Sequence, residues 1–141
     1  MKKLLWIVVL GLGLSSPVFS NSKLIPLKKL NINNQKNYSI ILARCSAIQV
    51  TELSLNDPNA EKRFDDMGLF IKKNIKFIKF IIPGKSETED AQNAIEFHEY
   101  YVSEYQKTLN KSLISIDRSF CTKLKKKLWE SFYYAYYFAI R

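Results

Sequence analysis

The sequence predicts an all-α protein, an antiparallel four-helix bundle held by one disulfide between Cys45 and Cys121. Three observations favour this fold class. Apolar residues recur every three or four positions in four separate stretches, the spacing that places them on one face of a helix. Short segments with capping and helix-ending residues separate the stretches, and short connections favour antiparallel neighbours. Strand signals are poor, because glycine and proline are few and valine is almost absent beyond residue 20.

The first 20 residues have the pattern of a cleavable signal peptide. Lys2 and Lys3 precede an apolar run at residues 4–14, and Val18 and Ser20 suit the positions just before a signal-peptidase cut. The apolar run is shorter than the roughly 20 residues that a membrane-spanning helix needs. No cysteine stands near the cut to carry a lipid anchor. We therefore expect cleavage after Ser20 and a mature chain that is periplasmic or secreted.

The mature chain is expected to begin with an irregular tail at residues 21–37, followed by a helical bundle domain at residues 38–141. The tail lacks a sustained period and contains a proline. The first helix is expected at residues 38–55, with Asn37 as its N-cap. Only Glu52 interrupts its apolar face, which consists of Tyr38, Ile41, Leu42, Cys45, Ile48 and Leu55.

The second helix is expected at residues 58–82. Asp57 can cap it, and Pro58 suits the first helical position, where its missing N–H costs nothing. We do not predict a strand at residues 74–82, because the apolar positions there follow the helix period of about 3.6 better than the strand period of 2. The face expected to be buried consists of Phe64, Met67, Ile71, Ile75, Ile78 and Ile82.

The third and fourth helices follow two further start signals. Ser86 and Glu89 form a capping box, and the third helix should continue to about residue 109. Its inward residues are expected to be Ala91, Ile95, His98, Val102 and Tyr105. A short break at residues 110–112 precedes a fourth helix at about residues 113–140. Its apolar stripe is expected to be Phe120 or Cys121, Leu124, Leu128, Phe132, Ala135 and Phe138.

The two cysteines fall on the apolar stripes of the first and fourth helices, which are adjacent in such a bundle. Cys45 is roughly 15 Å from the end of the first helix, and Cys121 is roughly 12 Å from the start of the fourth. These levels agree within one helical turn, so a disulfide can form, and an exported compartment favours oxidation. The chain has no Cys-x-x-Cys motif and only one histidine, which argues against a redox centre and a zinc site.

His98 is the only imidazole and lies on the inner face of the third helix. As an alternative to a core histidine bonded to a neighbour, it could bind haem or a metal, with Met67 as a second axial ligand. A c-type haem attachment motif is absent, so we expect a core histidine and no cofactor. The chain also has no Gly-x-Ser-x-Gly turn and no glycine-rich phosphate loop. These absences predict a protein that is not an enzyme.

Two surfaces remain as candidates for binding. The first is an aromatic C-terminal stretch with rings almost all round the helix, which is unusual for a surface helix. Either the tail covers it, or it contacts another chain or a membrane interface. Its residues are Trp129, Phe132, Tyr133, Tyr134, Tyr136, Tyr137 and Phe138. The second is a pair of lysine-rich helix faces, for which a merely solvated surface is the simpler interpretation: Lys72, Lys73, Lys76 and Lys79, and Lys123, Lys125, Lys126 and Lys127.

The charge balance limits the possible partners. Without Lys2 and Lys3 the chain has 20 cationic against 13 acidic side chains, a net charge of +7. An exported protein rarely meets nucleic acid, so we expect none as a partner. The favoured hypothesis is a small non-enzymatic interaction or structural module that binds another envelope protein or itself. The alternatives are a peripheral binder of anionic envelope lipid and a haem or metal carrier that uses His98.

Overall fold

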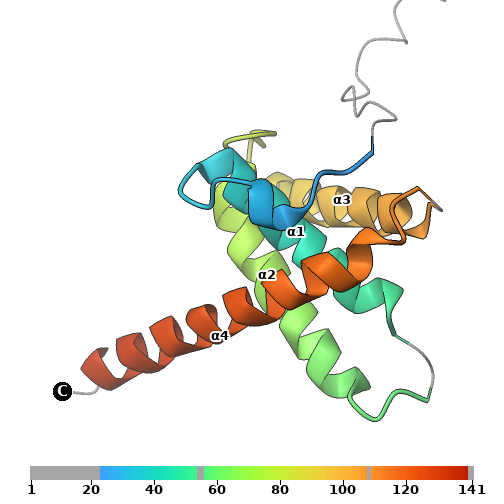
Figure 1. The fold of residues 1–141 in the computed structure, drawn as a ribbon. Helices are drawn as coiled ribbons and strands as arrows, with labels where there is room; N and C mark the ends of the chain where they lie inside the picture. The colour runs from blue at the N-terminus through green and yellow to red at the C-terminus, as the bar shows by residue number, and fades with distance from the viewer. Residues whose placement is uncertain (1–22, 54–55, 108, 140–141) are drawn as a thin grey trace, which may run out of the picture.

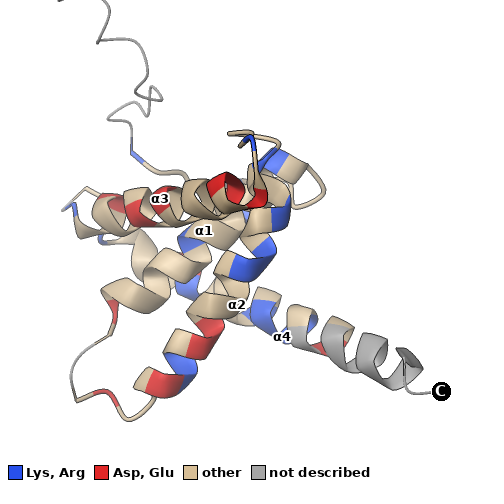
Figure 2. Ribbon diagram, turned by 180° about the vertical axis from the view of Figure 1, so that it is seen from behind, with Lys and Arg blue, Asp and Glu red and all other residues tan. Residues whose placement is uncertain are grey.

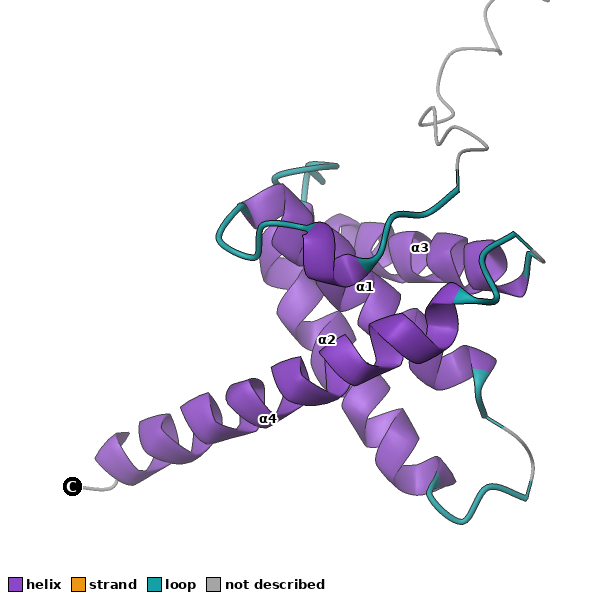
Figure 3. Ribbon diagram, viewed as in Figure 1, coloured by secondary structure: helices purple, strands orange, loops and turns teal. Residues whose placement is uncertain are grey.

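The computed structural model describes residues 23–53, 56–107 and 109–139, except for the side chains of Trp129 and residues 132–139. The signal peptide expected at residues 1–20 lies outside the described residues. Within them the chain is helical and forms no strand (Figure 3). The elements are η1 (Leu27–Lys29), α1 (Gln35–Thr51), α2 (Ala60–Ile78), α3 (Glu87–Gln106) and α4 (Leu113–Ala139). The all-α, four-helix fold class is confirmed.

α1 is the central helix of the protein. It contacts α2, α3 and α4, and its residues from Ile41 to Ile48 are all buried. A helix that is buried all round must be surrounded by other elements. Figure 1 shows α2 and α3 against α1, with η1 and the first half of α4 on its other side. The core therefore forms around α1.

α4 is tied to α1 by the expected disulfide. The Cα atoms of Cys45 and Cys121 are 5.5 Å apart, and both side chains are buried. The predicted pairing is confirmed. Beyond the disulfide, α4 runs past α2, and its C-terminal half extends away from the other three helices (Figure 1). Leu128, with 8% of its surface exposed, marks where the buried part of α4 ends among the described side chains.

Both boundaries of each of the first two helices differ from the prediction. α1 begins at Gln35, and its N-cap is Asn34, whose side chain accepts a hydrogen bond from the backbone N–H of Asn37 at 3.1 Å. The prediction of Asn37 as the cap was wrong, because an asparagine one turn earlier fills that role. α1 ends at Thr51, four residues before the expected end, and α2 covers Ala60–Ile78 rather than residues 58–82. The last predicted residues of α2 instead form turns ahead of Pro83.

The buried face of α2 was predicted only in part, since Ile78 is buried as expected but other buried positions were missed. Asp66, Phe70, Asn74 and Ile78 are buried, whereas Phe64 is 53% exposed. Sequence periodicity counted only apolar residues, but two of the buried positions are polar and have partners on other helices. The buried face of α3 is also shifted from the predicted one, but less than that of α2. Phe97 and Tyr101 are buried there, whereas Ile95 is exposed.

The N-terminal segment packs on the body through Leu24 and Leu27. Leu27 in η1 is fully buried, and its backbone N–H donates to Asp117 of α4 at 2.8 Å. Three residues earlier, the N–H of Leu24 donates to the side chain of Asn110 at 3.1 Å. These contacts place the segment over the start of α4. The aromatic C-terminal stretch, which it was expected to cover, lies at the other end of that helix (Figure 1).

Candidate functional site

A buried network of charged and polar side chains joins the N-terminal segment, α1, α3 and α4. Arg44 of α1 is 1% exposed and forms an ion pair with the fully buried Asp117 of α4. The Arg44 Nε donates to the hydroxyl of Tyr105 at 2.9 Å, and the guanidinium also donates to the carbonyl of Ile25 at 2.7 Å. The Tyr105 hydroxyl donates to Asp117 at 2.6 Å. The network therefore brings together residues from both ends of the chain.

This network ties the N-terminal segment, α1, α3 and α4 together. Every polar atom of Arg44 and Asp117 that is buried in the described structure has a partner. Burial raises the pKa of Tyr105, and its hydrogen bond to Asp117 raises it further against the effect of Arg44. The phenol therefore stays protonated and acts as a hydrogen-bond donor at neutral pH. Sequence reasoning missed both charged residues, although an arginine within the apolar run 40–48 was a signal of a buried partner.

His98 is a core histidine with a single described hydrogen bond. Its Nδ1 lies 2.6 Å from the hydroxyl of Ser46, and that hydroxyl donates its one hydrogen to the carbonyl of Ala43 at 2.8 Å. His98 Nδ1 is therefore the donor to Ser46. Burial lowers the pKa of His98 more than nearby Glu99 raises it, so the imidazole is neutral. Ser46 is fully buried and cannot reach a substrate.

The described residues offer no site for a metal ion. No group of three or more histidine, cysteine or acidic side chains is close enough to share one. Met67, considered as a second haem ligand, is half-buried on α2. In the described part of the chain, Nδ2 of Asn74 is the one buried side-chain nitrogen or oxygen without a hydrogen-bond partner. The side-chain oxygen of Asn74 accepts a hydrogen bond from Ser39. That contact lies between α1 and α2 and fits a packing role.

A corner of the molecule, where the start of α1 meets the end of α2, combines apolar and basic side chains. A cavity of about 300 Å³ lies between Ile32 and Phe77, and the ring of Tyr38 packs edge-on against Phe77 at 4.8 Å. One turn further along, Phe80 is 42% exposed. The same end of α2 and the residue that caps it carry three exposed lysines. We call this region the basic corner and define it as Ile32, Tyr38, Phe77, Phe80, Lys72, Lys76 and Lys79.

The segments that build the basic corner contain no acidic residue. None occurs at residues 21–51 or 67–86. Burial, and then the charges of Lys76 and Lys72, lower the pKa of Lys73, so lysines lie close to one another on this part of α2. Lys79 lies over the ring of Phe80, with its amine 5.8 Å from the ring centre. The corner therefore combines apolar surface with exposed lysines.

α3 carries the opposite charge. It holds six acidic residues and no lysine or arginine. Figure 2 shows the contrast between α3 and the basic residues of α2 and α4. Two of these acids adjoin the end of α2, where their carboxylates are engaged by the backbone: Asp90 accepts from Gly84 at 2.9 Å and Glu89 accepts from Lys85 at 2.6 Å.

The second lysine-rich face divides into paired and unpaired residues. Lys125 of α4 forms an ion pair with the buried Asp66 of α2 at 2.5 Å and is half-buried, so it is not part of a free lysine face. Lys123, Lys126 and Lys127 are exposed. The Lys125–Asp66 contact places α4 beside the first half of α2, away from the basic corner. The side chains of Trp129 and residues 132–139, the expected aromatic contact surface, lie outside the described residues.

No described helix is both long enough and apolar enough to cross a membrane. No family model, curated protein or solved structure matches this chain.

Proposed function

We propose that this protein is a non-enzymatic exported module that acts by binding, and that an anionic lipid surface is its best-supported partner. The observation that carries the proposal is the basic corner, where Phe80 and Ile32 are exposed at the end of α2 that also carries three exposed lysines, on segments without an acidic residue. Binding at a membrane surface combines these two features: apolar side chains enter the headgroup boundary, and cations attract anionic lipids.

The expected strength follows from the number of lysines. Each lysine near an anionic surface contributes about 1 kcal/mol, so Lys72, Lys76 and Lys79 together supply about 3 kcal/mol. Phe80 adds an apolar term when its exposed ring leaves water. The summed binding free energy corresponds to weak and reversible binding, as expected of a peripheral protein.

Two features support an exported location for this activity. The disulfide between Cys45 and Cys121 is of a kind that persists in oxidising compartments and is rare in reducing ones. The sequence of residues 1–20 has the pattern of a signal peptide. Both agree with a protein whose partner is an envelope surface.

The test is flotation of the disulfide-bonded mature chain with vesicles of phosphatidylglycerol or of phosphatidylcholine. Binding should require the anionic lipid and weaken as salt rises, because exposed charges are screened. The double variant Lys76→Gln/Lys79→Gln should bind about 30-fold more weakly, since two lysines are lost. The matched control, Lys23→Gln/Lys111→Gln, makes the same charge change at two exposed lysines outside the corner. Equal loss in both variants, or binding unchanged by salt, would contradict the proposal.

A second candidate is contact with another protein chain through the end of α4. The observation that favours it is that the C-terminal half of α4 extends beyond the other helices (Figure 1), in a region rich in aromatic residues. Such a helix could pack against a second copy or another envelope protein. Sedimentation should then show a dimer that a chain ending at residue 128 no longer forms, while its helix content per residue is unchanged. A monomeric full chain would exclude self-association, and a truncated chain that unfolds would show that the aromatic stretch belongs to the core.

A further inference from the structure

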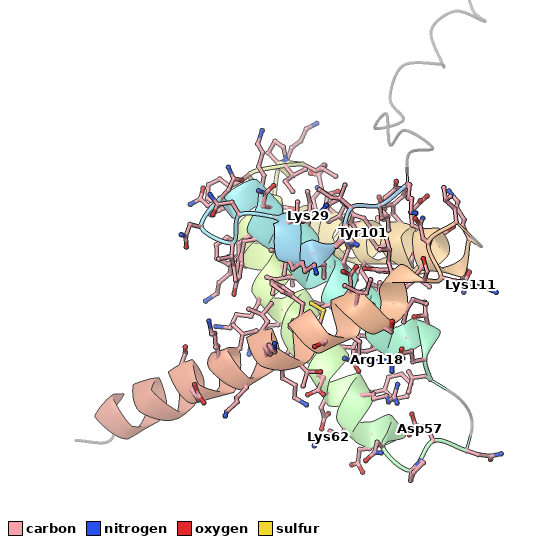
Figure 4. All side chains as sticks on the ribbon, viewed as in Figure 1. Lys29, Asp57, Lys62, Tyr101, Lys111 and Arg118 are labelled. Carbon is pink, nitrogen blue, oxygen red and sulfur yellow. A yellow bond between two sulfur atoms is a disulfide. The ribbon has the colours of Figure 1, made fainter. Side chains whose placement is uncertain are left out.

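A polar cleft lies at the end of the molecule opposite the basic corner. It has a volume of about 320 Å³ and opens between the last turn of α1, the first turns of α2 and the first half of α4. Four cationic side chains and two acidic ones line it, so the lining has a net charge of +2: Lys62, Arg63, Arg118, Lys125, Glu52 and Asp66. Figure 4 shows Arg118 and Lys62 on this side of the protein, together with Asp57.

The two acids of the cleft are already neutralised by their neighbours. Glu52 forms ion pairs with both Arg118 and Arg63, the second at 3.4 Å. Asp66 is paired with Lys125 at 2.5 Å. Arg63 is also held by Asp57 at 2.8 Å. These contacts fix the positions of the cations before any ligand arrives, which lowers the entropy cost of binding.

Arg118 and Lys62 retain the capacity to bind an anion. The Arg118 side chain is 53% exposed and uses one nitrogen in its described contact with Glu52. Because a guanidinium has five N–H donors, most of its donors remain available. Lys62 is exposed and forms no ion pair with any described residue. Asn59, the N-cap of α2, also lines the cleft and leaves the first amides of the helix without a side-chain cap.

We propose that this cleft binds a small molecule carrying a phosphate group, with Arg118 and Lys62 as the main contacts. The cleft has an excess of positive charge, and arginine and lysine are the usual protein ligands of phosphate oxygens. The volume suits a small ester such as a polyol phosphate. The same chemistry is found in free phosphate esters and in lipid headgroups with a terminal phosphate.

This site is separate from the proposed lipid surface. The cleft is at the start of α2 and the basic corner at its end, roughly 25 Å apart at the rise of an α-helix. Failure of one proposal therefore leaves the other standing, and variants can be assigned to one site or the other.

The experiment is an NMR titration of the disulfide-bonded mature chain with glycerol 3-phosphate. We expect saturable shifts of backbone amides at residues 59–63 and 118–125. Loss of one charge-assisted contact in Lys62→Gln should weaken binding about tenfold. The matched control, Lys111→Gln, removes an exposed lysine elsewhere and should bind like the parent protein. Circular dichroism of both variants checks that the fold is unchanged.

A second titration separates the two sources of phosphate. Vesicles that contain phosphatidate are compared with vesicles that contain the same amount of phosphatidylglycerol, which lacks a terminal phosphate. A phosphatidate preference that Lys62→Gln abolishes identifies a headgroup ligand, and glycerol 3-phosphate binding without that preference identifies a free ester. The proposal is overturned if neither ligand gives saturable shifts, or if Lys62→Gln and Lys111→Gln bind equally well.

Discussion

Replacing Asp117 by alanine leaves the guanidinium of Arg44 buried without its counter-charge. The substitution removes three hydrogen bonds to the carboxylate, from Arg44, from the Tyr105 hydroxyl and from the N–H of Leu27. Arg44 is 1% exposed and cannot reach water without opening the contact between α1 and α4. Removing one partner of such a buried pair costs about 3 to 5 kcal/mol. For a mature chain of this length the midpoint of thermal unfolding should fall by about 12 to 20 °C.

The assay is urea and thermal unfolding followed by circular dichroism, with the disulfide intact. Asp65→Ala is the matched control, because Asp65 is exposed and its loss should change the unfolding free energy little. Replacing both members of the pair, as in Arg44→Met/Asp117→Leu, should recover most of the loss, because no buried charge is then left alone. A loss below about 1 kcal/mol in Asp117→Ala would refute the reasoning, since that is the range of an exposed ion pair.

Further predictions concern the disulfide, the buried histidine and two glycines. The double variant Cys45→Ala/Cys121→Ala opens a loop of 76 residues and should lose about 4.5 kcal/mol of unfolding free energy in urea titrations; an unchanged midpoint would contradict the chain-entropy argument. Burial lowers the pKa of His98 below its usual 6.5, so only the unfolded state gains a proton as pH falls below that value. Stability should therefore decline from there through the lowered pKa of the folded state, and His98→Gln should flatten that decline in unfolding measured across pH. At Gly84 an added Cβ would lie 2.8 Å from the backbone of α3, so Gly84→Ala should cost about 1 to 3 kcal/mol. Gly68→Ala, with open space around it, should instead stabilise α2 by about 0.5 to 1 kcal/mol, and equal effects in thermal unfolding would count against this contrast.

The fold class and the disulfide could be predicted because they depend on local signals. Apolar periodicity identified four helices, and Ser86 caps α3 as predicted, since its hydroxyl accepts the N–H of Glu89 at 3.2 Å. The Glu89 carboxylate accepts from the N–H of Lys85, one residue earlier than a capping box requires. Cys45 and Cys121 could be paired because helix rise converts residue counts into heights. Each of these inferences uses residues within one helix or the order of the helices along the chain.

The sites depend on contacts between distant residues, which periodicity does not show. A charged residue reads as exposed until its partner is known, so Arg44 and Asp117 were missed as core residues. Lys125 was grouped with its exposed neighbours for the same reason, although Asp66 holds it. The basic corner requires residues 32 and 77 to be adjacent, which follows only from how α1 packs on α2.

The docking of η1 has a consequence for the order in which the chain can fold. Leu27 is among the earliest described residues to be synthesised, yet its hydrogen-bond acceptor is Asp117, 90 positions later. A ribosome makes the chain from the amino end, so this segment has no place to dock until most of the protein has been produced. Closing so long a loop is slow compared with forming a helix. The opening segment should therefore be the last piece to become protected from hydrogen exchange.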